Sequence, residues 1–194
     1  MIRLEGLGWT MGDAADKPPS DGPGARAVGS AMARITEAIA LLQGGDRGEA
    51  RERFATIWTE IAAEPDPFAE CVLAHYMADT QDDVIGELTW DLRALHAADR
   101  VTQTRAAMHH PTLSIAAFYP SLYLNVADDY FRLGDFASAR CFLDSGRSCL
   151  DSLPDTGLAG MIRAGLDRLA ARLHADDPSG RAATCSSSSR SGRP

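Results

Sequence analysis

One stretch constrains the fold more than any other, residues 121–153, which read SLYLNVADDYFRLGDFASARCFLDSGRSCLDSL. Its apolar residues recur every three or four positions on both sides of a central Gly-Asp pair, the pattern of two helices joined by a tight turn. Gly134 tolerates the positive φ that ends a helix, and Asp135 has a side-chain oxygen that caps the next one. The small residues Ala127 and Ala139 fall where the two stripes face each other. The pattern therefore predicts a close-packed, antiparallel helical hairpin.

This hairpin resembles a tetratricopeptide repeat. The matching positions are the small and aromatic residues of that motif and its turn: Ala127, Tyr130, Leu133-Gly134-Asp135, Ala139 and Gly146. The sequence departs from the motif at Tyr123, where tryptophan is frequent, and at Leu143, where an aromatic residue is preferred, and the proline after the second helix is displaced to Pro154. The resemblance implies an array of helical hairpins whose concave groove binds other proteins.

Further helices are predicted on both sides of this hairpin. Capping chemistry marks where some of them begin, because Asp66-Pro67 and Asp46 are typical helix starts. The region 100–120 interrupts the spacing, and Pro120 is expected to kink or end a short helix that starts at Pro111. The other predicted helices are 30–43, a segment from Asp46 that reaches Ile61, 67–80, 84–98 and 156–175.

Together these segments predict one all-α domain over residues 29–175, a tetratricopeptide-like right-handed stack of about three helical hairpins plus a C-terminal capping helix. The helix 84–98 is expected to lie inside the stack because it is apolar on two sides. The first side carries Ile85, Leu88, Leu92 and Leu95, and the second carries Trp90, Ala94 and Ala97. Residues 1–28 are predicted to be a disordered extension, and residues 176–194 a disordered Ser-rich tail.

Composition excludes several classes of partner. The net charge of −8 argues against nucleic acid or an anionic membrane as the main partner. There is no apolar run long enough to span a bilayer, and the N-terminus lacks the apolar core of a signal peptide, so we expect a cytoplasmic protein. No cofactor or metal is predicted, because the sequence contains no P-loop, nucleophile elbow, dinucleotide fingerprint or paired-histidine zinc motif.

The register of the repeat family implies which residues line the groove. On the hairpin 121–153 these positions are Leu124, Asn125, Asp128 and Phe131, with Arg132 beside them. On the helix 67–80 they are Cys71, His75 and Asp79. At the N-terminal end the same register exposes Ile35, Ile39 and Leu42. These stripes carry no lysine or arginine of their own. We therefore expect a partner protein or peptide segment that is apolar and basic, with Asp79 and Asp128 as its charge contacts.

Two other functions stay open at this point. Cys71, His75 and Asp79 share a helix face, and a pocket formed by His75, Asp79, His109 and His110 would favour an enzyme or a small-ligand-binding protein. A large exposed apolar patch would instead favour a self-association module. The carboxylates Glu70, Asp79, Glu87 and Asp91 form either an acidic face that attracts a basic partner or an ordinary solvated surface.

Overall fold

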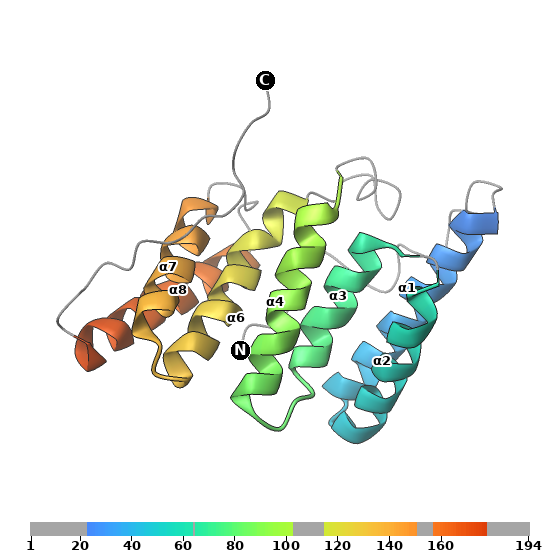
Figure 1. Cartoon of the computed structure of the whole chain (residues 1–194), viewed down its shortest axis with the longest axis horizontal. Helices are drawn as coiled ribbons and strands as arrows, with labels where there is room; N and C mark the ends of the chain where they lie inside the picture. Colours follow the sequence, from blue (N-terminus) through green and yellow to red (C-terminus); the bar gives the residue numbers. More distant parts are fainter. Residues whose placement is uncertain (1–22, 64, 103–114, 151–156, 178–194) are drawn as a thin grey trace.

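The computed structural model describes residues 23–63, 65–102, 115–150 and 157–177, and over these ranges the protein is all-α. The helices pack as hairpins α1–α2, α3–α4 and α6–α7, which lie side by side, and α8 lies against α6 and α7 (Figure 1). Their bounds are α1 Pro23–Gln43, α2 Arg47–Ile61, α3 Pro67–Ala78, α4 Val84–Arg100, the short 3-10 helix Ile115–Ala117, α6 Tyr119–Arg132, α7 Phe136–Ser148 and α8 Gly157–Asp176. None of the described helices is long and apolar enough to cross a bilayer.

The predicted turn chemistry is confirmed in the first and third hairpins. Gly134 has a φ of 79°, and the Asp135 carboxylate accepts a hydrogen bond from the backbone N–H of Ser138 at 3.0 Å. The α1–α2 turn repeats this arrangement, because Gly45 has a φ of 94° and Asp46 accepts from the N–H of Glu49. Only glycine adopts such a φ without strain, so both turns depend on it.

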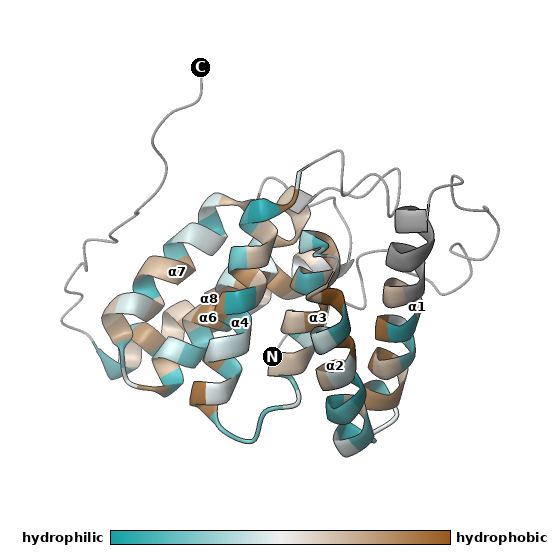
Figure 2. Cartoon of the chain, turned by 45° about the vertical axis from the view of Figure 1, so that its right-hand side comes forward, coloured by the Kyte–Doolittle hydropathy of each residue, from teal (hydrophilic) through white to brown (hydrophobic). Residues whose placement is uncertain are grey.

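Buried apolar side chains form two clusters. The first cluster contains residues of α1, α2, α3 and α4, together with Phe118 and Leu122 at the start of α6. The second cluster contains residues of α6, α7 and α8. Aromatic contacts link the first two hairpins, since Trp58 and Trp90 pack edge to face with ring centroids 4.9 Å apart. Helices α2 and α8 each bury one apolar face, and Figure 2 shows hydrophilic residues along much of α2. The buried members of those two faces are Ala50, Phe54, Ile57, Ile61, Ile162, Leu166, Leu169 and Leu173.

The close approach of α6 and α7 predicts a large effect for a larger side chain at their contact. Ala127 and Ala139 are both fully buried there. We expect Ala139→Leu to lower the free energy of unfolding by about 1–3 kcal/mol, because a packed helix crossing has no space for additional methylene groups. Urea unfolding followed by circular dichroism measures this, with Ala137→Leu at an exposed position of the same helix as the control. A wild-type midpoint for Ala139→Leu would show that the predicted register of this hairpin is wrong.

Three sequence predictions need correction. Helix α1 begins at Pro23, so residues 23–28 belong to a helix and not to the predicted disordered extension. Pro120 lies in the first turn of α6, where its missing N–H leaves no helical hydrogen bond unmade, and it does not end a helix. Helix α4 exposes 67% of Ile85 and buries Asp91 instead. The predictions for His109, His110 and Pro111 lie outside the described residues.

A candidate functional site: a buried polar cluster between α3, α4 and α6

Four polar side chains meet in the interior where the second and third hairpins pack together. His75 from α3, Asp91 from α4, and Asn125 and Asp129 from α6 are each at most 5% exposed, and we call them the buried polar cluster. Residues four apart lie on the same helix face, so Asn125 and Asp129 form one polar row on α6. Glu87 and Asp91 form a matching row on α4. Two amphipathic helices thus contact each other partly through carboxyl groups.

His75 is held by the amide of Asn125. Its Nδ1 atom lies 3.4 Å from the Asn125 amide nitrogen and 3.8 Å from a carboxylate oxygen of Asp91. An amide nitrogen only donates, so Nδ1 accepts and the ring proton resides on Nε2. Burial lowers the pKa of His75, and the nearby charge of Asp79 offsets this only in part, so the imidazole is neutral at neutral pH.

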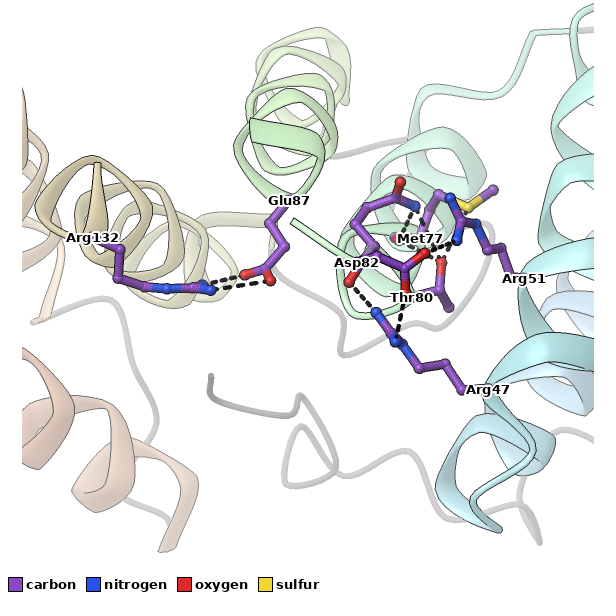
Figure 3. Close-up of polar contacts among 8 residues, drawn as sticks. Arg47, Arg51, Met77, Thr80, Asp82, Glu87 and Arg132 are labelled. Atoms are coloured by element: carbon purple, nitrogen blue, oxygen red, sulfur yellow. Dashed lines mark hydrogen bonds and ion pairs between the residues drawn. The ribbon is translucent and has the colours of Figure 1, made fainter. Parts of the chain in front are cut away.

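Arg132 closes the cluster at its solvent edge. Its guanidinium forms a bidentate ion pair with Glu87 across the α4–α6 contact. Figure 3 shows both contacts between these two side chains. It also lies 3.4 Å from a carboxylate oxygen of Asp129. We call Glu87, Asp91, Asn125, Asp129 and Arg132 the α4–α6 seam. Two of its carboxylates therefore share one guanidinium.

The interior carboxyl groups of the seam are short of hydrogen-bond donors. Among the described residues, neither oxygen of Asp91 and only one oxygen of Asp129 has a hydrogen-bond partner. Burial raises the pKa of Asp91. Burial also raises the pKa of Asp129, and the negative charges of Asp91 and Glu87 raise it further. Two ionised carboxylates cannot donate to each other, but a proton on Asp129 supplies the donor that Asp91 lacks. One proton between the two carboxyl groups therefore supplies the missing donor and removes one of the two like charges.

This site is closed to solvent. Two surface hollows, of about 360 and 510 Å³, lie along α1 and α2, and their linings include Glu37 and Arg53 but neither His75 nor Asp79. No group of His, Cys, Asp and Glu within the described ranges has a geometry that could hold a metal ion. The cluster can therefore store a proton between helices, but it has no described opening through which a substrate would reach it.

The predicted groove residues separate into two sets in the structure. His75, Asn125 and Arg132 join the buried polar cluster and its edge, and Cys71 is buried on α3 in the first apolar cluster. Leu124, Asp128 and Phe131 lie where α6 meets α8. Cys71, His75, Leu124, Asn125 and Phe131 are buried, Asp79 and Asp128 are half-buried, and Arg132 is exposed.

Helix α8 lies on the face of α6 that was predicted to contact a partner. The guanidinium of Arg172 donates to Asp128 at 2.7 Å and lies 4.2 Å from the centroid of the Phe131 ring. The apolar row Ile162, Leu166, Leu169 and Leu173 packs beside these contacts in the second apolar cluster. This part of the surface is thus covered by the apolar face and an arginine of an amphipathic helix from the same chain.

Arginines of the same chain also neutralise much of the predicted acidic face. Glu70 pairs with Arg100, and Glu87 pairs with Arg132. Asp82, at the start of the α3–α4 turn, receives both Arg47 and Arg51 from α2, as Figure 3 shows. Asp91 lies inside the protein. The pairs of Asp82 and Glu87 connect neighbouring hairpins, whereas that of Glu70 connects the two helices of the second hairpin. These carboxylates do not form one open acidic surface.

Sequence reasoning missed Asp129 and misplaced Asp91. A signal was present for both, because each carboxylate occupies a position of an otherwise apolar stripe. Asp129 comes three residues after the buried Val126 and seven after the buried Leu122. Asp91 comes three residues before the buried Ala94. A carboxylate in an apolar stripe is therefore a signal for a buried polar contact, and it need not mark the end of the buried face.

Comparison with known proteins finds no matching family model, no matching curated protein and no matching solved structure.

Proposed function

We propose that the chain is a protein-binding helical-repeat module, similar to tetratricopeptide repeats, that acts as an adaptor or regulatory scaffold through the inner surface of its hairpins. The contact between α8 and α6 supports this proposal most directly. There, the apolar face of an amphipathic helix lies on α6 and places an arginine against Asp128 and Phe131. A helix lying in a groove on apolar anchors is a recurrent mode of peptide recognition. The chemistry of this internal contact matches the apolar and basic partner expected from the sequence.

The pocket alternative has less support. His75 is fully buried, and neither hollow described along α1 and α2 includes it. An enzyme or small-ligand site needs a concave space that its polar groups can reach. A repeat module needs only an exposed surface on stacked hairpins. The geometry of the described residues thus favours the binding module.

The expected partner segment competes with Arg172. Asp128 keeps part of its side chain exposed while it binds this arginine, and Asp79 is also half-buried. A basic side chain of a partner would displace the Arg172 guanidinium from Asp128, while apolar side chains of the same segment would lie beside it. We expect Asp79 to be the second charge contact.

A displayed library of random peptides, presented to the full-length chain, tests this proposal. We expect enrichment of peptides that combine aliphatic residues with arginine or lysine. For an enriched peptide, Asp128→Ala and Asp79→Ala should weaken binding by about 1–3 kcal/mol if the charge pairs are desolvated, and by less if they stay hydrated. Arg172→Ala should tighten binding, because it removes the internal competitor while it keeps Asp128.

The control is Glu52→Ala, which removes an exposed carboxylate on α2 and should leave the affinity unchanged. Circular dichroism establishes that each variant is folded. Tighter binding by Asp79→Ala or Asp128→Ala would contradict the proposal, as would a library that yields no enriched peptide.

A further inference from the structure

We propose that the α4–α6 seam is a pH-responsive contact, in which one proton shared by Asp91 and Asp129 keeps the second and third hairpins packed and its loss at alkaline pH loosens them. Asp91 and Asp129 come from different hairpins, both are buried, and three of their four oxygens have no hydrogen-bond partner among the described residues.

Among the described residues, the charges that face this pair leave no other way to neutralise it. On α4 the neighbouring charged group is Glu87, which is itself negative, and on α6 it is Arg132. The Arg132 guanidinium is already engaged by Glu87. If both aspartates were ionised, three carboxylates would therefore share the one cation that the described residues place beside them, Arg132. Like charges this close in a buried site oppose each other's ionisation.

The groups from α3 do not compensate either. His75 faces Asp91 at 3.8 Å, but burial keeps its imidazole neutral. Its Nε2 atom is also buried without a hydrogen-bond partner in the described part of the chain. Asp79 adds a negative charge near His75, and Cys71 is a buried thiol. The proton between Asp91 and Asp129 thus supplies the hydrogen-bond donor that the buried carboxyl groups of the seam lack.

Removal of this proton should act on the seam before it acts on the rest of the fold. Ionised carboxylates need donors, and water is the donor that remains when no side chain is free. Water reaches Asp91 and Asp129 only if α4 and α6 move apart. The α1–α2 hairpin has no such pair among its described residues, because Ala50, Phe54, Ile57 and Ile61 make up its buried α2 face. Loosening should therefore be confined to the seam.

Hydrogen–deuterium exchange of the full-length chain at pH 6 and pH 9.5 tests this inference, with labelling times corrected for the intrinsic exchange rate. Exchange reports local opening of each helix separately. We expect amide protection in α4 and α6 to fall at least tenfold at pH 9.5, while protection in α1 and α2 stays within a factor of about two.

Asp129→Asn and Asp91→Asn should each keep the protection of α4 and α6 at pH 9.5, since each removes one ionisable group of the pair. Asp144→Asn, at an exposed carboxylate on α7, should behave as the wild type. Three outcomes would overturn the inference. These are equal protection of the wild type at both pH values, equal loss of protection in all helices, and loss in both asparagine variants as large as in the wild type.

Discussion

Asp129→Asn should raise the free energy of unfolding by about 2–4 kcal/mol at pH 9 and change it little at pH 4. An uncompensated buried charge destabilises a protein by several kcal/mol, and asparagine fills nearly the same volume without a charge. Burial raises the pKa of Asp91 to about 7, and burial together with the charges of Asp91 and Glu87 raises the pKa of Asp129 to about 9. An ordinary aspartate in the unfolded chain titrates at about 4.

The sign of the pH dependence follows from these values. Between pH 4 and pH 9 the folded state holds protons that the unfolded state has lost, so the free energy of unfolding falls as the pH rises through this window. Asparagine holds no titrating proton, so the variant should show a flatter profile. His75 has a lowered pKa and contributes the opposite trend, which is confined to pH below about 6.5.

Urea unfolding at pH 4, 7 and 9 measures this prediction. The matched control is again Asp144→Asn, for which the profile should be parallel to the wild type. Profiles for Asp129→Asn and the wild type that stay parallel from pH 4 to pH 9 would show that Asp129 is not protonated in the folded protein. A lower stability of the variant at pH 9 would lead to the same conclusion.

The local features of the fold were predictable from the sequence because they depend on neighbouring residues. Gly134 and Asp135 are adjacent, and together they determine a helix end, a turn and the next helix start. The same holds for Asp66-Pro67, where the aspartate accepts hydrogen bonds from the N–H groups of Phe68 and Ala69. The periodic apolar rows of α2 and α8 are equally local, and each row forms the buried face of its helix.

The face that a helix presents to distant parts of the chain was harder to predict. Periodicity places Cys71, His75 and Asp79 on one side of α3, but it does not say which helix packs there. In the structure His75 contacts Asn125, which is 50 residues away in sequence. Burial of Asp91 depends on the same distant segment. Pattern reasoning assigns a carboxylate to solvent by default, so it placed the apolar Ile85 inside and Asp91 outside.

Leu166→Ala should lower the free energy of unfolding by about 2–5 kcal/mol. Leu166 is fully buried in the second apolar cluster, where α8 contacts α6 and α7. Removal of three carbon atoms from such a site loses their transfer free energy and leaves a cavity that the surroundings fill only in part. Met161→Ala on the same helix is the control, since this side chain is 51% exposed and its truncation should change stability by less than about 0.5 kcal/mol.

A double-mutant cycle with Gly146 tests whether Leu166 acts through its contact with α7. A Cβ atom at Gly146 would lie 3.0 Å from a methyl group of Leu166 and 3.3 Å from Tyr123, so Gly146→Val alone should destabilise by about 1–3 kcal/mol. In the Leu166→Ala background the added methyl groups would enter the space that the leucine leaves. The double variant should then be more stable than the sum of the single changes predicts, by about 0.5–3 kcal/mol. If the two changes in the free energy of unfolding, measured with urea, are strictly additive, then Leu166 of α8 does not contact α7 at Gly146.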